Sequence, residues 1–79
     1  MKKRPPRSYY KDELFMKQVG EKIREIRSRN DVSIEALANE CGVDYSQVNR
    51  MELGKVNFSI SYLSKIATAL GVDPKELLP

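Results

Sequence analysis

The sequence predicts an all-α domain of five helices, and its helix starts and apolar periodicity support this prediction. Four helix starts share one pattern: an apolar residue precedes a Ser or Asp, and another apolar residue follows four positions later. No segment keeps the alternation of apolar and polar residues that is typical of a strand. The four starts are Val32-Ser33 with Leu37, Val43-Asp44 with Val48, Phe58-Ser59 with Leu63, and Val72-Asp73 with Leu77.

The first helix is predicted to begin after Asp12 and to run to about Arg29. Asp12 is a good cap because its carboxylate can accept a hydrogen bond from a free amide of the first turn. Gly20 costs about 1 kcal/mol relative to Ala inside a helix, so we expect another helix to pack closely against it. The apolar stripe of this helix consists of Leu14, Phe15, Val19, Ile23 and Ile26.

The second and third helices lie within residues 32–54 and are joined by a very short turn. Ser33 is placed to cap the second helix, and Gly42 ends it because glycine readily takes a positive φ. Asp44 is placed to cap the third helix, and Gln47 follows three residues later, as in a capping box.

The residues around this turn have the spacing of a helix-turn-helix motif. Ala38 is the small residue that two steeply crossing helices need at their closest approach, and Val48 is an apolar contact back into the crossing. If Val48 and Met51 point inward, the outward face of the third helix presents Tyr45, Ser46, Asn49 and Arg50.

Two further helices complete the domain predicted for residues 12–79. The fourth begins at Ser59 and ends at Gly71, with Ile60, Leu63, Ile66, Ala67 and Leu70 facing inward. The fifth is short, from Pro74 to Leu78, and Pro at the first helical position favours it.

Basic residues are concentrated at the start of this 79-residue chain, whose formal net charge is +3. Residues 1–11 contain five basic residues and no acidic one, which leaves nine basic and eleven acidic residues for the rest. We predict a flexible basic arm over residues 1–11, which is either a solubilising tail or a segment that binds a DNA groove. The residues expected to contact DNA from the arm are Lys2, Lys3, Arg4 and Arg7.

The composition argues against catalysis and against metal or cofactor binding. The chain has no histidine, which is the usual general base and metal ligand near neutral pH. Its one cysteine, Cys41, lies on an apolar face and is predicted to be a buried packing thiol. Because there is neither a long apolar run nor a signal-peptide pattern, we expect a soluble, cytoplasmic protein without a membrane partner or a small-molecule ligand.

The region from Val19 to Leu78 resembles the Cro and phage-repressor type of helix-turn-helix domain, the xenobiotic-response-element family. The matching stretches are SIEALANECGV, the outward residues of DYSQVNRMELGK, and SISYLSKIATALGV. The resemblance implies a lambda-repressor-like fold and a sequence-specific DNA-binding transcriptional regulator. Two positions depart from the family pattern: Ile34 stands where phage repressors often have Gln, and Phe58 stands where Pro is usual.

The third helix, residues 44–53, is the expected reader of bases in the major groove. Arg50 can bind the two acceptors of guanine, and Asn49 can bind the donor and acceptor edge of adenine. Gln47 can be shared between the helix cap and the DNA. In the family that the chain resembles, the positions that match Tyr45, Ser46, Asn49 and Arg50 are the usual base readers.

The resemblance also implies contacts away from the bases. Ser33 matches a position that meets one phosphate strand, and Lys55 and Asn57 lie in the loop expected to meet the other side. Arg27 and Glu52 match a pair that forms a salt bridge in family members.

Such domains usually bind pseudo-palindromic sites as dimers, which makes a homodimer on double-stranded DNA the expected assembly. The candidate dimer contacts are Ile60, Tyr62, Leu77 and Leu78, although the two leucines can instead close the core. The alternative function is a protein-interaction module on the same fold, such as an antitoxin or adaptor. The acidic balance of residues 12–79 favours this alternative.

Overall fold

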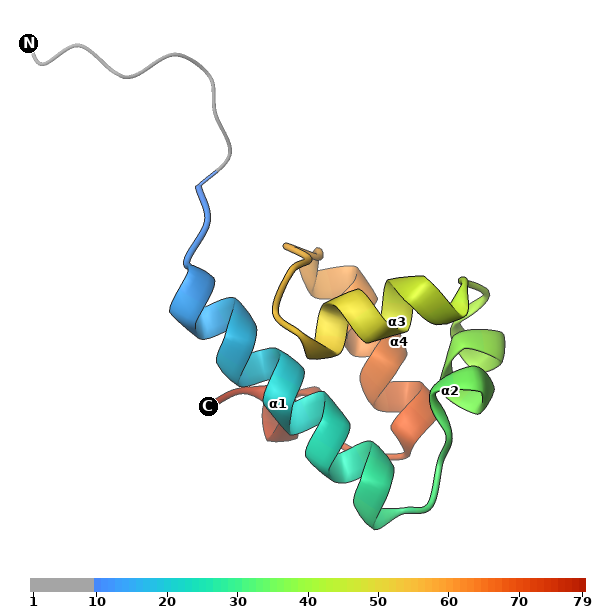
Figure 1. The fold of residues 1–79 in the computed structure, drawn as a ribbon. Helices are drawn as coiled ribbons and strands as arrows, with labels where there is room; N and C mark the ends of the chain where they lie inside the picture. Colours follow the sequence, from blue (N-terminus) through green and yellow to red (C-terminus); the bar gives the residue numbers. More distant parts are fainter. Residues whose placement is uncertain (1–9) are drawn as a thin grey trace, which may run out of the picture.

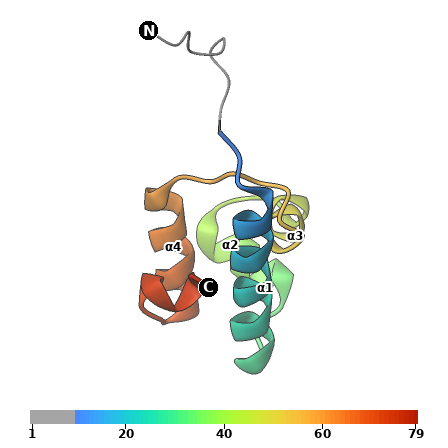
Figure 2. The same cartoon turned by 90° about the vertical axis from the view of Figure 1, so that its left-hand side faces the viewer.

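A computed structural model describes residues 10–79, which form four α-helices followed by one 3₁₀ turn (Figure 1). The helices are α1 (Glu13–Arg29), α2 (Ile34–Cys41), α3 (Tyr45–Glu52) and α4 (Ile60–Leu70), and the turn is η1 (Pro74–Leu77). No strand occurs within these described residues, in agreement with the predicted all-α class. The helix α3 packs on α1 and α2, whereas α4 packs on α2 and η1, and Figure 2 shows α4 and α1 standing apart on either side of α2.

The prediction of a fifth helix is wrong, because η1 has only four residues. Asp73 and Glu76 form the capping box that starts the turn, and Pro74 occupies its first position. Leu78 then adopts an extended conformation, with φ −93° and ψ 145°. The following residue is Pro79, and a residue that precedes proline is disfavoured in the helical region. The sequence therefore starts a helix here that cannot continue.

Side chains cap three of the four α-helices. The side-chain oxygens of Asp12, Ser33 and Ser59 each accept a hydrogen bond from the backbone amide three residues later. The capping box predicted for Asp44 and Gln47 is wrong, because no side-chain bond caps α3. The Gln47 amide instead donates to the backbone carbonyl of Asp44 at 3.0 Å. The carboxylate of Asp44 is left exposed at the start of α3.

The core is formed by all four helices and η1. Its buried apolar residues are Val19, Ile23, Ile26, Leu37, Ala38, Cys41, Val48, Met51, Ile66, Ala67, Leu70 and Leu77. Leu14 and Phe15, which were predicted to continue the stripe of α1, are 67% and 44% exposed. The buried part of α1 begins only at Val19, so the first turn of this helix lies outside the core.

Gly20 allows α1 to approach the end of α3, as the sequence predicted. A Cβ atom at Gly20 would lie 2.3 Å from the carbonyl oxygen of Met51 and 2.7 Å from that of Glu52. Such distances are far inside van der Waals contact, so any larger residue would push the two helices apart. The glycine therefore sets the position of α3 relative to α1.

A candidate nucleic-acid interface

The inward face of α3 fixes this helix on the domain. Val48, Met51 and Glu52 are buried, and Ala38 of α2 is buried at the helix crossing. Gly42, at φ 70°, makes the turn between the two helices. The small residue, the glycine and the apolar contact of the motif therefore occupy the places expected of them.

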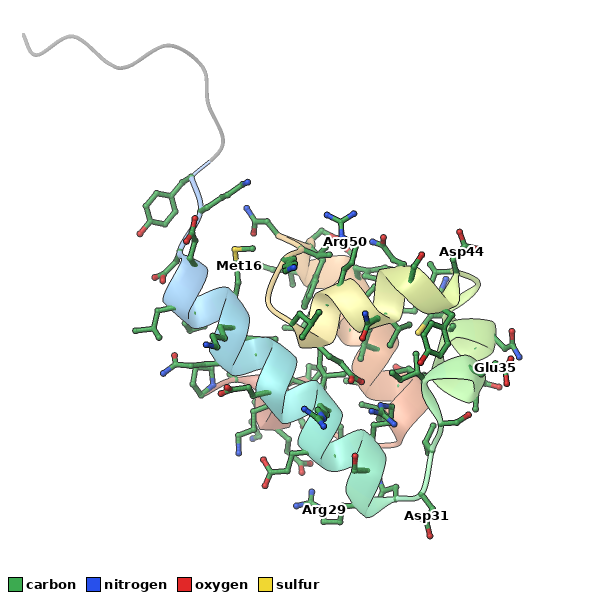
Figure 3. The ribbon with its side chains drawn as sticks, viewed as in Figure 1. Met16, Arg29, Asp31, Glu35, Asp44 and Arg50 are labelled. Carbon is green, nitrogen blue, oxygen red and sulfur yellow. The ribbon has the colours of Figure 1, made fainter. Side chains whose placement is uncertain are left out.

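The outward face of α3 is polar and accessible. Tyr45 is 57% exposed, and Ser46, Asn49 and Arg50 are also exposed. Gln47 is half-buried, so less of its side chain is free for an external contact. Figure 3 shows the Arg50 side chain directed away from the domain, with Asp44 near the opposite end of the helix.

A nearly buried ion pair holds the end of α3 to α1. The Arg27 Nε donates to a carboxylate oxygen of Glu52 at 2.6 Å, and Nη2 donates to the other at 3.1 Å. A further guanidinium nitrogen of Arg27 donates to the Val32 carbonyl at 2.9 Å. The Arg27 and Glu52 side chains are only 12% and 5% exposed. The salt bridge that the resemblance implied is therefore confirmed. Arg27, which lies in α1, is bonded both to α3 and to the segment that precedes α2.

The ion pair also shifts the pKa of Arg27. The hydrogen bond with Glu52 raises the pKa of Arg27, although desolvation opposes the shift. The buried carboxylate of Glu52 thus faces a permanently charged guanidinium, and the pair compensates the cost of burying either group alone.

The residues proposed for phosphate contact lie at two separate places. Ser33 is exposed at the start of α2, where its hydroxyl accepts from the Ala36 amide at 3.0 Å. Lys55 and Asn57 are exposed in the loop between α3 and α4. The Asn57 side-chain amide donates to the backbone carbonyl of Tyr10 at 3.0 Å. No sequence pattern predicted this contact, because the two residues are far apart in the chain.

The basic arm residues Lys2, Lys3, Arg4 and Arg7 lie outside the described residues. The chain enters the described region at Tyr10, on the same side of the domain as Arg50 and the loop after α3 (Figures 1 and 3). Lys11 and Lys17, which no sequence motif singled out, line a depression of about 350 Å³ together with Lys55. These lysines could not be found from sequence because only the fold brings the start of α1 beside the loop after α3.

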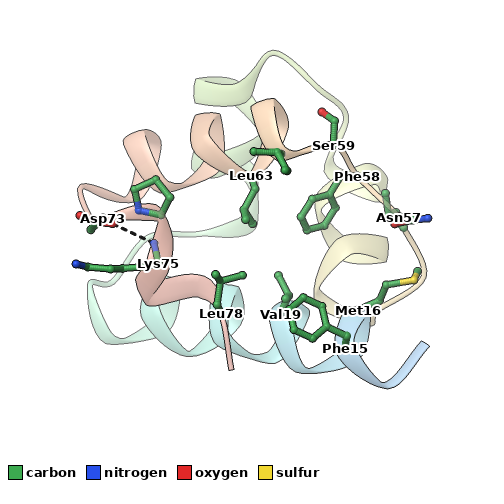
Figure 4. Close-up of a pocket in the computed structure, with 13 residues that line it drawn as sticks. Phe15, Met16, Val19, Asn57, Phe58, Ser59, Leu63, Asp73, Lys75 and Leu78 are labelled. Atoms are coloured by element: carbon green, nitrogen blue, oxygen red, sulfur yellow. Dashed lines mark hydrogen bonds between the residues drawn. The ribbon is translucent and has the colours of Figure 1, made fainter. Parts of the chain in front are cut away.

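The candidate dimer residues differ widely in exposure. Ile60 is 86% exposed and Leu78 is 40% exposed, whereas Tyr62 is half-buried. The expected contact through Leu77 is wrong, since this residue is fully buried in the core, where η1 packs on α1 and α4. A groove of about 590 Å³ lies beside Ile60 and Leu78, and Phe15, Val19, Phe58 and Leu63 contribute to its lining (Figure 4).

The described residues offer little to catalysis. Burial raises the pKa of the Cys41 thiol, which lies in the core as predicted. Among residues 10–79, no group of three or more Cys, Asp or Glu side chains is placed to hold a metal ion. None of the helices in this part of the chain has the length and apolar character needed to cross a membrane.

Comparison with known proteins identifies several similar chains. A helix-turn-helix family model matches residues 23–77. The control protein C.BamHI of Bacillus amyloliquefaciens is 43% identical over 60 residues, which cover 75% of this chain and 74% of that protein. These names denote regulators rather than enzymes.

Two solved structures are similar to this chain in both fold and sequence. The restriction-modification controller protein C.AhdI of Aeromonas hydrophila superimposes with a TM-score of 0.76 at 38% identity, covering 80% of this chain and 96% of that one. A hypothetical transcription factor, NHTF, from Neisseria superimposes with a TM-score of 0.75 at 32% identity, covering 92% and 85% of the two chains.

Proposed function

Because this chain belongs to the Cro-type helix-turn-helix family of DNA-binding transcriptional regulators, we propose that it recognises an operator by inserting α3 into the major groove. The observation that carries the proposal is the division of α3 into a buried face and an exposed polar face. The exposed side chains are of the types that form paired hydrogen bonds with base edges. The protein is proposed to work in the cytoplasm.

Within α3, each exposed side chain has a distinct proposed role. Arg50 donates to the two acceptors of a guanine, and Asn49 binds an adenine edge. Tyr45 and Ser46, in the first turn, contact a base edge, a thymine methyl group or a phosphate. Gln47 is a secondary reader because it is half-buried.

Phosphate contacts on both sides of α3 would fix its register in the groove. Ser33 stands at the start of α2, where free amides and the helix dipole attract an anion. Lys55 and Asn57 follow α3 and would meet the other strand. The basic arm of residues 1–11 joins the domain on the side that carries Arg50, so we assign its basic residues to a groove beside the one α3 occupies.

We further propose that two copies bind a pseudo-palindromic operator. One recognition helix contacts only a few base pairs, and a two-fold dimer places two such helices about 34 Å apart. The exposed Ile60 and Leu78, with the groove beside them, offer an apolar surface of the kind that a second copy would cover. Neither residue belongs to the polar face of α3, so a dimer formed there leaves the base-reading surface free.

Selection of bound duplexes from random DNA tests the proposed function. We expect one enriched sequence with two-fold symmetry, and binding that weakens steeply as salt rises. Arg50→Ala should cost about 1–3 kcal/mol at the position that Arg50 contacts and relax the base preference there. Binding that shows no preferred duplex and no salt dependence would contradict the proposal.

A further inference from the structure

A basic surface adjoins the recognition helix and extends beyond it. Lys11 lies just before α1, Lys17 lies in its second turn, Lys55 lies in the loop after α3, and all three line one depression. Leu53 and Gly54, which follow α3 directly, belong to the same lining. The depression therefore continues the recognition helix at its C-terminal end.

Gly54 allows the loop after α3, which carries Lys55, to approach α1, which carries Lys17. It has a φ of 75°, and a Cβ atom there would lie 2.6 Å from the Cα atom of Lys17. The backbone of the loop thus rests against the backbone of α1. The spacing between Lys17 and Lys55 is consequently set by main-chain packing rather than by flexible side chains.

Asn57 helps to fix the position of Lys11 relative to the loop after α3. Its side-chain amide holds the carbonyl of Tyr10, the residue immediately before Lys11. This bond joins the segment before α1 to the loop after α3. The bond therefore directs the entering chain toward the loop after α3.

The three lysines have no ion-pair partner among the described residues. The ion pairs among residues 10–79 are Lys22 with Glu25 and Arg27 with Glu52, so none of the three lysines is neutralised in this way. Two acidic residues lie near them. Asp12 uses its carboxylate to cap α1, and Glu13 lines the depression, which leaves an excess of positive charge.

We propose that Lys11, Lys17 and Lys55 form a phosphate-binding rim that lengthens the DNA contact of each protomer outward from α3, and that Asn57 is the positioning residue for Lys11. The inference rests on the proposed function, because a duplex seated on α3 is what would bring its backbone over the rim. Met16, which also lines the depression, lies between the start of α1 and the loop after α3 in Figure 3, on the side of the domain toward which Arg50 points. Point charges on flexible stems suit phosphate without reading sequence.

The first test uses the full-length double variant Lys11→Gln/Lys17→Gln and the duplex enriched by selection. The slope of log K against log salt should become shallower by about 0.9 for each phosphate contact that is lost. Affinity should fall by a similar factor on the selected duplex and on unrelated duplexes, since the rim reads no bases. The single variant Lys17→Gln has a matched control in Lys22→Gln, which also removes one positive charge from α1 but away from the depression, and which should leave the slope unchanged.

Duplex length provides a second measure of the rim. Wild-type protein should bind a duplex extended by about half a helical turn at each end more tightly than one that stops at the selected core. The Lys11→Gln/Lys17→Gln protein should lose this preference. If the double variant keeps both the wild-type slope and the length preference, the rim does not exist, even though binding to the selected core would still support the proposed function.

A double-mutant cycle separates the positioning role of Asn57 from a direct phosphate contact. In the wild-type background, Asn57→Ala should weaken binding and flatten the salt dependence. In the Lys11→Gln background, the same change should have a smaller effect, because only the direct phosphate contact of Asn57 then remains to be lost. Fully additive effects would overturn the positioning role. Absence of any sequence-preferred binding by wild-type protein would instead refute the proposed function itself.

Discussion

The residues that start the helices do not all act in the same way, although they look alike in the sequence. Ser33 and Asp44 each precede a short helix of eight residues, and each follows a partly buried valine. Only Ser33 makes the side-chain bond that its position predicts. At Asp44, the backbone carbonyl accepts a hydrogen bond from the backbone amide of Gln47. The Asp44 carboxylate makes no cap bond and stays exposed beside the outward face of α3.

This difference leads to a stability prediction for the two caps. Ser33→Ala should cost about 1 kcal/mol of unfolding free energy, because it removes a formed cap bond. Asp44→Ala should cost clearly less, since no side-chain bond is lost. Urea unfolding of both variants measures the two values. Equal losses would show that the Asp44 carboxylate does cap α3 in solution.

At the scale of elements, local pattern predicted most boundaries but not which parts would be buried. The cap residues and the glycines Gly42 and Gly71 act through neighbours within a few positions, so the sequence predicted where α2 and α4 start and end. Leu14 and Phe15 continue the helical periodicity of α1, yet nothing local showed that the core would begin only at Val19. Periodicity identifies a face of a helix, whereas burial depends on what packs against that face.

In the candidate site too, features within one helix could be predicted from the sequence, whereas contacts between distant parts of the chain could not. The exposed face of α3 follows from periodicity within one helix, and the Arg27–Glu52 pair followed from the family resemblance. The bond between Asn57 and Tyr10 joins distant parts of the chain and leaves no local signal. For Leu77, the sequence left two roles open, a dimer contact and closure of the core, and the packing of η1 on α1 and α4 decides for the core.

The connection between α1 and α3 yields a prediction for Arg27. Arg27→Ala leaves the buried Glu52 carboxylate without its partner, which typically costs about 3–5 kcal/mol. For a domain of this size, each kcal/mol lowers the melting temperature by about 4–8 °C, so thermal unfolding should detect the change readily. DNA binding should weaken with it, because the pair holds the end of the recognition helix.

Removing both members of the ion pair provides a control for this test. Arg27→Ala combined with Glu52→Ala should recover part of the lost stability, since no buried charge then remains unpaired. An unchanged melting temperature in the single variant would mean that the pair contributes nothing in solution.

For the whole molecule, the decisive feature is the separation of the exposed polar face of α3, proposed to read bases, from the apolar groove beside Ile60 and Leu78. The chain has 79 residues, and domains this small bury only about 60% of their unfolded surface. An additional apolar interface would therefore stabilise the fold as well as pair two recognition helices. The groove beside Ile60 and Leu78, lined by aromatic and aliphatic side chains, is the surface that the described residues offer for such an interface.

Ile60→Glu tests this interface without damaging the monomer. Ile60 is 86% exposed at the first position of α4, where an acidic residue is favoured by the helix dipole, so unfolding should show no loss of stability. A charge placed in an apolar contact should shift sedimentation at micromolar concentration toward monomer and weaken binding to the two-fold symmetric duplex. Ser61→Glu adds the same charge one residue later, outside the groove lining, and should behave as wild type. If Ile60→Glu sediments and binds as wild type does, the two copies meet through another surface or not at all.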